Sequence, residues 1–345
     1  MIFFFITSFF IIFIAFFIYI SQSVNLIENV SERKIHLKPA RLIGGLIIYS
    51  TIIFSLFLFE TTNLFKYSVI VSFAILLLGL ADDIYKISYI KRIFFQIFVC
   101  SLIFGNGIII SDLGPIFQDN SILYLGYFAY FISILSIVGL TNAINFIDGI
   151  DGLASAIVLN SVLVIIIYNN FSNYQINEIT YNELIIVIIP LTLFIILNIS
   201  NFFYFKIFLG DAGSNFLGFF LAILLILYTM DNYRLFHPVL APWCVCYPVY
   251  DMLNVILQRL SKRKNPFLTD NSHLHTKLFI LFNKNQFKVL ILILIFSFSL
   301  SIIGLIIFIF ISPLFSLLSF ILLFIPYFII NTALSNHVRK KSFSN

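Results

Sequence analysis

Acidic and amide side chains gather in three short segments of the sequence, and their types suit chemistry on a charged substrate. Asp82 and Asp83 stand side by side after an apolar run, and Asp211 lies in Phe-Leu-Gly-Asp-Ala-Gly-Ser at 208–214. Segment 142–152 reads Asn-Ala-Ile-Asn-Phe-Ile-Asp-Gly-Ile-Asp-Gly. Carboxylates beside long apolar stretches cost free energy unless they are paired or bound to a metal ion. We therefore treat all three segments as candidate functional sites.

The adjacent pair Asp82 and Asp83 has the weakest purely structural explanation. The pair follows an apolar run that we expect to be helical, and the dipole at a helix C-terminus disfavours negative charge. The two anions also repel each other, so we expect a cationic partner. Asp151 and Asp211 precede apolar runs, where a helix N-terminus alone can stabilise an acid. Three acidic segments together favour function over that structural interpretation.

The ligand types indicate a hard divalent cation. Carboxylate and amide oxygens suit Mg²⁺ or Mn²⁺, and the three cysteines all lie inside apolar runs that give no zinc or disulfide pattern. Such a cation commonly binds together with phosphate. Gly213 and Ser214 follow Asp211 at the expected start of a helix, whose free amides can face an anion. We therefore expect a site for Mg²⁺, or Mn²⁺, and phosphate.

A basic segment, 258–288, adds charge of the opposite sign. It contains His273 and His275, which can contact phosphate oxygens or a metal ion. Arg259 lies eight residues after Asp251 on the same face of an expected helix, which suits an ion pair or a phosphate clamp. We assign the Lys-Arg-Lys run that follows Arg259 to membrane anchoring alone.

The elements that position these segments are membrane helices. Hydrophobic residues make up 61% of the 345-residue chain and charged residues 10%, whereas soluble domains have about 45–50% and about 25%. A soluble globular enzyme is therefore excluded, and we predict an all-α polytopic membrane protein with one domain, 1–345. Apolar stretches of membrane length predict eleven helices, or ten if the last two are one. The stretches are 2–20, 43–60, 66–81, 93–110, 122–140, 153–169, 183–200, 214–230, 236–257, 289–311 and 313–332.

Basic residues predict the orientation of these helices. All but two of the 20 Lys and Arg residues fall on one alternate set of segments, and the exceptions are Lys66 and Arg234. The positive-inside rule then places the N-terminus outside, the C-terminus in the cytoplasm and five loops on the cytoplasmic face. The net charge of +5 belongs to this face, so we expect contact with membrane lipid and no nucleic-acid partner. The five loops are 21–42, 82–92, 141–152, 201–213 and 258–288.

Four motifs together resemble one family of membrane enzymes. They are Gly-Leu-Ala-Asp-Asp at 79–83, Asn-Ala-Ile-Asn-Phe-Ile-Asp-Gly-Ile-Asp-Gly-Leu at 142–153, Ile-Phe-Leu-Gly-Asp-Ala-Gly-Ser at 207–214 and Asp-Asn-Ser-His-Leu-His at 270–275. In this order they are similar to the polyprenyl-phosphate N-acetylhexosamine-1-phosphate transferases of glycosyltransferase family 4. They look like the branch that initiates O-antigen, capsule or teichoic-acid linkage synthesis, rather than phospho-N-acetylmuramoyl-pentapeptide translocase.

The resemblance implies a reaction and its location. Members of this family transfer a sugar 1-phosphate from a UDP-sugar to undecaprenyl phosphate with Mg²⁺ and release UMP. They act on the cytoplasmic face of the bacterial inner membrane, and their fold is a bundle of ten or eleven helices. A homodimer is an expectation of the resemblance alone. The motifs do not distinguish one UDP-N-acetylhexosamine from another.

The resemblance also implies roles for individual residues. Asp82, Asp83 and Asp211 are the expected catalytic residues. Asp211 and Asp83 are the expected metal ligands, and the other member of the adjacent pair would position or deprotonate the lipid phosphate. A covalent aspartyl-phosphate is the alternative route. The expected substrate-binding residues are Lys38, Asn142, Asn145, Asp148, Asp151, Asn201, Lys206, Gly213, Ser214, Arg259, His273 and His275.

Two other classes of protein explain part of the pattern. A membrane transporter would use the pair Asp82 and Asp83 as a cation site. It predicts acids near mid-membrane and an internal repeat, whereas the acids here lie at the ends of apolar runs and no repeat is evident. A non-catalytic scaffold would require that the carboxylates be dispensable. We rank a transferase above both.

Overall fold

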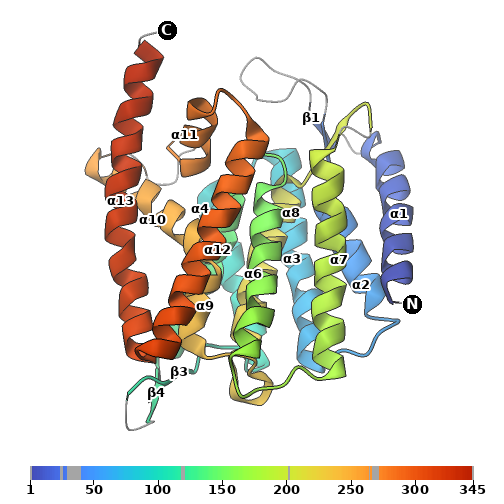
Figure 1. The fold of residues 1–345 in the computed structure, drawn as a ribbon. Coiled ribbons are helices and arrows are strands. Elements are labelled where there is room, and N and C mark those ends of the chain that lie inside the picture. Colours follow the sequence, from blue (N-terminus) through green and yellow to red (C-terminus); the bar gives the residue numbers. More distant parts are fainter. Residues whose placement is uncertain are drawn as a thin grey trace.

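Helices make up most of the structure (Figure 1). The computed structural model describes residues 2–23, 26–28, 40–117, 121–200, 203–263, 265 and 272–343. Its helices are α1 (Ile2–Ser21), α2 (Gly44–Ser55), α3 (Asn63–Tyr85), α4 (Tyr89–Gly105), α5 (Phe128–Ile147), α6 (Leu153–Asn170), α7 (Glu178–Ile199), α8 (Gly210–Leu227), α9 (Ala241–Cys244), α10 (Cys246–Ser261), α11 (Leu274–Leu281), α12 (Gln286–Phe310) and α13 (Pro313–Phe343). Between them lie β1 (Ile27–Glu28), β2 (Ala40–Leu42), β3 (Asp112–Pro115), β4 (Ile122–Tyr124), β5 (Lys206–Phe208) and the 3-10 turns η1 (Asp231–Tyr233) and η2 (Pro238–Leu240).

The helices agree with the predicted apolar stretches. Each of the eleven stretches contains a helix, and the ninth is divided between α9 and α10. In the described part of the chain, eight helices are long and apolar enough to cross a membrane, and the bent pair that ends with α10 makes a ninth candidate. α2 has 12 residues and α4 has 17. An all-α polytopic membrane protein is therefore confirmed, and the number of crossings and their orientation stay predictions.

The ninth apolar stretch is broken rather than continuous. Val245 has non-helical backbone angles, and the helices on either side of it are bent by 69°. Pro248 explains the break, because proline has no N–H to donate to the carbonyl four residues earlier and its ring crowds that carbonyl. The carbonyl in question, that of Cys244, instead accepts a hydrogen bond from Ser161 Oγ at 2.7 Å.

The fifth and the last two apolar stretches also have boundaries set by local chemistry. The predicted helix over 122–140 is wrong at its start, because β4 pairs antiparallel with β3 and α5 begins only at Phe128. α12 and α13 are separate helices. Ser312 Oγ accepts a hydrogen bond from Phe315 N at 3.2 Å, and Pro313 suits the first position of a helix.

α8 lies at the centre of the bundle, and small residues let its neighbours approach closely. It is buried along almost its whole length against α3, α5 and α2. A Cβ built on Gly79 of α3 would lie 2.4 Å from the carbonyl oxygen of Asp211, and one on Gly45 of α2 would lie 2.2 Å from Gly213 Cα. Membrane helices that lack a hydrophobic driving force pack through such small residues.

Described parts of the loops that we expect on one face lie at one end of the bundle. β1 and α11 lie at this end and the β3–β4 hairpin lies at the other, as Figure 1 shows. β2 pairs antiparallel with β1 and parallel with β5, so loop 21–42 is joined to loop 201–213. The N-terminus of α1 and the C-terminus of α13 lie at opposite ends (Figure 1).

Candidate active site

Asp83 caps the helix that carries Asp211. Asp83 Oδ1 accepts the N–H of Asp211 at 3.0 Å, and Oδ2 accepts the N–H of Ala212 at 3.1 Å. The first amides of a helix have no partner within it, so a carboxylate is a good cap. Gly210 has φ +76°, and a Cβ there would lie 2.9 Å from Asp83 Oδ2, so glycine gives the carboxylate room. These amides therefore face a carboxylate, not the phosphate that the sequence analysis placed there.

Asp82 makes a different set of contacts. It is 4% exposed, its Oδ2 forms an ion pair with Arg92 of α4, and its Oδ1 accepts the N–H of Ile87 at 2.7 Å. The cationic partner that we expected for the acidic pair is therefore confirmed, and it is Arg92. Both carboxylate oxygens of Asp82 stabilise the turn between α3 and α4, whereas the carboxylate of Asp83 faces α8.

Amide side chains of α5 contact the place where α3 meets the start of α8, which we call the α3–α5–α8 junction. Asn145 Nδ2 donates to Asp211 Oδ1 at 2.9 Å and to Ser214 Oγ at 2.8 Å. Asn142, three residues earlier on the same side of α5, donates to Gln96 Oε1 of α4 at 2.8 Å. The structure thus brings Asn145, Asp211 and Ser214 into direct contact. Gln96, which accepts from Asn142, donates in turn to Asn215 Oδ1 of α8 at 3.4 Å.

Asp148 and Asp151 lie in the turn between α5 and α6. Asp151 Oδ2 forms an ion pair with Lys206 Nζ of β5 at 3.2 Å. Burial, together with repulsion from Asp211, Asp83 and Asp151, raises the pKa of Asp148 well above its ordinary value. Four carboxylates are therefore within electrostatic range of one another, and in the described part of the chain only Asp151 among them forms an ion pair.

His273 and His275 form a second polar cluster with Asp251 of α10. His273 Nδ1 donates to Asp251 Oδ2 at 2.8 Å, and Asp251 Oδ1 accepts the N–H of Leu274 at 2.9 Å and the hydroxyl of Tyr327 at 3.1 Å. The two imidazole rings are stacked, with centroids 5.5 Å apart and planes 18° apart. The ligand atoms of the two histidines and Asp251 lie within 4.8 Å of one another, so this group can also hold a metal ion.

The histidine cluster contacts the turn that carries Asp148. A Cβ built on Gly149 would lie 2.5 Å from His275 Nε2, so the ring packs directly on the backbone of that turn. The ring of Phe146 lies 5.8 Å from that of His273. Burial lowers the pKa of His275 to about 4, so its imidazole is neutral at pH 7. Its Nδ1 is buried and has no hydrogen-bond partner among the described residues.

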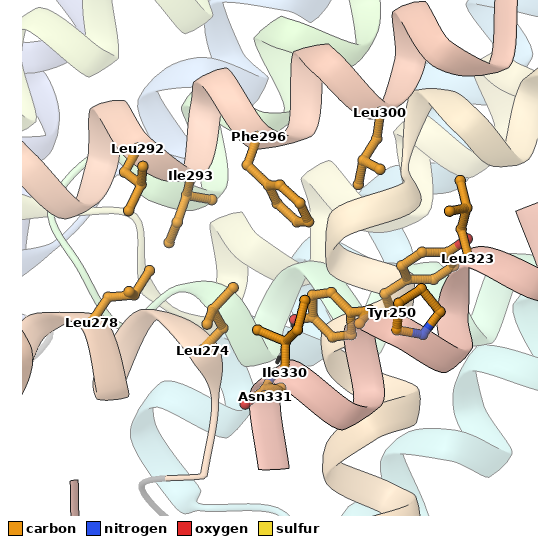
Figure 2. A pocket seen from close by; sticks show the side chains of 12 residues that line it. Tyr250, Leu274, Leu278, Leu292, Ile293, Phe296, Leu300, Leu323, Ile330 and Asn331 are labelled. Atoms are coloured by element: carbon orange, nitrogen blue, oxygen red, sulfur yellow. Dashed lines mark hydrogen bonds between the residues drawn. The ribbon is translucent and has the colours of Figure 1, made fainter. Parts of the chain in front are cut away.

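An apolar cavity lies beside the histidine cluster. It has a volume of about 320 Å³ and is lined by residues of α10, α11, α12 and α13. Figure 2 shows Ile293 and Phe296 of α12 projecting toward Leu274 and Tyr250. Tyr327, which donates to Asp251, also lines this cavity. The cavity therefore combines an apolar interior with one wall that reaches the histidine cluster.

Some expected binding residues have other contacts or lie outside the described part. Lys38 and Asn201 are outside the described residues. Gly213 packs against Gly45, and Ser214 Oγ donates to the Gly210 carbonyl at 3.0 Å, so both serve the packing of α8.

Arg259 does not reach Asp251 in the way that the spacing suggested. Eight residues of helix rise about 12 Å, which is too far for a direct ion pair. Arg259 is 5% exposed near the end of α10, and Asp251 pairs with His273.

Four polar residues near the site were not found from the sequence: Arg92, Gln96, Asn215 and Tyr327. Asn215 Nδ2 donates to the Asp211 carbonyl at 2.8 Å. Gln96, Asn215 and Tyr327 each lie inside an expected membrane stretch, and an isolated polar residue there is the signal that could have identified them.

The carboxylates where α3, α5 and α8 meet are of the chemical type that binds a divalent cation. Asp211 Oδ2 has no hydrogen-bond partner among the described residues, and Asp148 is held near Asp83 and Asp211 against their repulsion. Carboxylate oxygens are hard ligands that suit Mg²⁺ or Mn²⁺. The expected metal ligands Asp83 and Asp211 are therefore of the right chemical type, and their binding of a cation stays a prediction. Among the described residues, the group of three or more possible ligands whose atoms lie within 4.8 Å of one another is Asp251, His273 and His275.

Comparisons with known proteins agree with this geometry. Residues 64–229, from α3 to just beyond α8, match the family Glycosyl transferase family 4. The undecaprenyl-phosphate alpha-N-acetylglucosaminyl 1-phosphate transferase of Pasteurella multocida (strain Pm70) is 36% identical over 265 residues, which cover 74% of this chain and 72% of the relative. Proteins of the same name are 29% identical over 74% of this chain and 70% of the relative in Escherichia coli O157:H7, and 39% identical over 21% and 20% in Haemophilus influenzae. The chain therefore belongs to glycosyl transferase family 4, the family that its four motifs predict.

Proposed function

We propose that this protein transfers N-acetylglucosamine 1-phosphate from UDP-N-acetylglucosamine to undecaprenyl phosphate, releases UMP and so initiates polysaccharide synthesis. The relatives above are named for N-acetylglucosaminyl 1-phosphate transfer on undecaprenyl phosphate, which favours this sugar among those that the motifs leave open. The positive-inside rule supports a reaction at the cytoplasmic face of the bacterial inner membrane. A homodimer is a further expectation, which sedimentation in detergent would test.

The observation that carries this proposal is the junction of α3, α5 and α8. Asp83 caps α8, Asn145 holds Asp211, and Asp148 is kept close to both carboxylates. In a membrane bundle these charges are costly, so a purely structural role is a poor explanation. A preorganised group of carboxylates at a helix junction matches metal-assisted phosphoryl transfer.

The reaction exchanges one phosphoanhydride bond for another. An oxygen of the lipid phosphate bonds to the β-phosphorus of the UDP-sugar, and the bond from that phosphorus to the bridging oxygen breaks, so UMP leaves with the electron pair. A divalent cation, when bound, offsets the negative charge of the diphosphate. Asp211 and Asp83 would hold it at the start of α8, and Asp148 lies within electrostatic range of both. Asn145 keeps Asp211 Oδ1 in place through its 2.9 Å hydrogen bond.

The contacts of the acidic pair support direct attack over a covalent aspartyl-phosphate. A nucleophilic carboxylate must approach phosphorus in line, whereas Asp82 is 4% exposed and bound by Arg92 and Ile87 N. Both oxygens of Asp83 accept amide hydrogen bonds from α8. Rapid quenching with ³²P-labelled UDP-sugar tests this choice, since direct attack leaves no acid-stable label on the protein.

The cavity beside the histidine cluster can accommodate part of the lipid chain. Leu274 lines it and directly follows His273, so a phosphate near the histidine would lie next to an apolar volume of about 320 Å³. Burial of apolar chain there would contribute about 25 cal/mol for each Å² removed from water.

The proposal is tested by following UMP and lipid-linked product by mass. Purified protein receives undecaprenyl phosphate, Mg²⁺ and one of several UDP-N-acetylhexosamines. We expect UMP with UDP-N-acetylglucosamine, only when lipid and metal are both present. Asp211→Asn should lower kcat by at least about 100-fold, whereas Glu178→Gln, an exposed acid in the first turn of α7, should not. The absence of UMP with every donor, from folded protein given lipid and metal, would refute the proposal.

A further inference from the structure

Asp251 is a buried carboxylate, and its hydrogen bonds in the described structure come from His273, Leu274 and Tyr327. It is completely buried. Its Oδ1 accepts hydrogen bonds from Leu274 N and Tyr327 Oη, and its Oδ2 accepts one from His273 Nδ1 at 2.8 Å. A carboxylate has no hydrogen to donate, so His273 Nδ1 carries the proton in this contact. The opposite ring nitrogen, Nε2, is then available to a ligand.

We propose that Asp251 is a positioning residue for the transfer reaction, because it holds His273 in the tautomer with the proton on Nδ1 and so presents Nε2 to a substrate phosphate. This inference rests on the proposed function. In this tautomer Nε2 can accept the hydrogen of a phosphate monoester. Once it is protonated, it donates to a phosphate oxygen, and Asp251 balances its charge.

The residues around His273 support the inference that this cluster orients the His273 ring. His275 stacks on one side of the His273 ring, and Phe146 lies 5.8 Å away. The neutral His275 ring is itself packed on Gly149, in the turn that carries Asp148. His273 is therefore held by a hydrogen bond and by ring contacts, next to the carboxylate junction.

The same three residues can be considered as a metal site, and the hydrogen bonds argue against it. A metal ion that used His273 Nδ1 would have to displace the proton of this contact, because Nδ1 and Asp251 Oδ2 are 2.8 Å apart and hydrogen-bonded. Asp251 Oδ1 already accepts two donors. Metal-bound histidines normally use one nitrogen for the metal and the other for the carboxylate. The geometry thus matches the outer carboxylate of a histidine, and His273 Nε2 is the atom that meets a ligand.

Asp251→Asn is the sharpest test because it changes one atom of the contact. Asparagine keeps an oxygen for Leu274 N and Tyr327 Oη and replaces Oδ2 by an amino group, which cannot accept from Nδ1. We expect His273 to move its proton to Nε2 and kcat/KM to fall about 10- to 100-fold, as for loss of a charge-assisted hydrogen bond. The control Glu178→Gln makes the same kind of change, from carboxylate to amide, at an exposed residue in the first turn of α7, so we expect less than about a threefold change.

A double-mutant comparison distinguishes positioning from a structural or metal-binding role. If Asp251 acts through His273, then Asp251→Asn has no further effect on kcat/KM in the His273→Gln background. An equal loss in both backgrounds, or wild-type activity in Asp251→Asn, would overturn the inference. So would one equivalent of transition metal in the purified wild-type protein that Asp251→Asn loses. Thermal unfolding of each variant in detergent identifies those that do not fold.

A spectroscopic measurement keeps this test independent of turnover. In protein labelled with ¹⁵N-histidine, the His273 signal, assigned by its loss in His273→Gln, should show the Nδ1–H tautomer. Asp251→Asn should shift it to Nε2–H. An Nε2–H tautomer in the wild-type protein would overturn the inference even if the enzyme is active. If wild type releases no UMP but shows the Nδ1–H tautomer, the proposed function fails and the orienting contact stands.

Discussion

Gly79→Ala should reduce activity by separating α3 from α8 at the place where Asp83 caps α8. Gly79 precedes Asp83 by four residues, so both lie on the face of α3 that meets α8. A Cβ at position 79 would lie 2.4 Å from the Asp211 carbonyl oxygen and 2.5 Å from Ala212 Cα. These are backbone atoms, and ordinary contact begins at 3.4 Å. The helices must therefore move apart by about 1 Å, because no side chain can rotate away.

The size of the effect follows from the two hydrogen bonds at the cap. They measure 3.0 and 3.1 Å, so a movement of about 1 Å breaks both. Overpacking of this kind costs about 1–3 kcal/mol of stability, and a displacement of about 1 Å in an active site costs about 100-fold in rate. We therefore expect kcat for UMP release to fall about 100-fold in Gly79→Ala.

Gly139→Ala is the matched control for this substitution. Gly139 is also inside a membrane helix, and a Cβ there would meet only Met252 Cε, at 3.8 Å. Both variants gain the helix propensity of alanine, up to about 1 kcal/mol, so the comparison isolates the contact with α8. UMP release and the thermal midpoint are measured for both in the same detergent. Equal rates and midpoints in the two variants would refute the close packing of α3 on α8 at the site.

Three further predictions concern other parts of the fold. Ile293→Trp should fill the apolar cavity and raise KM for undecaprenyl phosphate several-fold, with KM for the UDP-sugar unchanged. Glu183→Gln should lower the free energy of unfolding by about 1–3 kcal/mol, because this buried side chain accepts three hydrogen bonds, including one from Tyr228 Oη, and an amide nitrogen cannot accept. Burial lowers the pKa of His275 from 6.5 to about 4, so unfolding takes up a proton between these values, and stability falls as the pH drops through this range. His275→Gln should therefore flatten the dependence of the thermal midpoint on pH between 4 and 6.5.

Each of these predictions has a control and an outcome that contradicts it. Ile295→Trp, on the same helix but 59% exposed, should leave both KM values unchanged. An equal rise in KM for undecaprenyl phosphate in the two tryptophan variants would show that the cavity does not bind the lipid. Tyr228→Phe removes one donor to Glu183 without adding a conflict, so it should cost less than Glu183→Gln. An unchanged slope of the thermal midpoint against pH in His275→Gln would mean that other groups cause the loss of stability in acid.

Hydropathy predicted the helices well because a membrane leaves few alternatives. A stretch of about 20 apolar residues in lipid must satisfy its own backbone, and a helix is the simplest solution. Hydropathy did not predict the short strands, because β2 and β5 have three residues each and their paired residues are 166 positions apart in the sequence. The break at Val245 was readable in principle, since Pro248 removes the hydrogen bond to Cys244.

The sequence identified the acidic residues of the candidate site but missed several of the polar residues that contact them. Asp83, Asp148 and Asp211 stood out because a charge next to an apolar run needs a reason. The start of α8 was expected to bind phosphate, and that failed because Asp83 accepts its amide hydrogens. No local pattern could show this contact, since the two partners are 128 residues apart. Gln96 and Tyr327 were missed because each is a single polar residue in a long apolar stretch.

The adjacent aspartates illustrate why the sequence cannot divide roles within a motif. Consecutive residues point about 100° apart around a helix, so Asp82 and Asp83 necessarily face different neighbours. Arg92 offsets the charge of Asp82, and the amide dipoles of α8 stabilise that of Asp83. The repulsion within the pair is thus relieved at two separate places. Asp211 and Asp148 receive no such cationic partner among the described residues, and both lie beside α5, where the proposed function places the cation and the diphosphate.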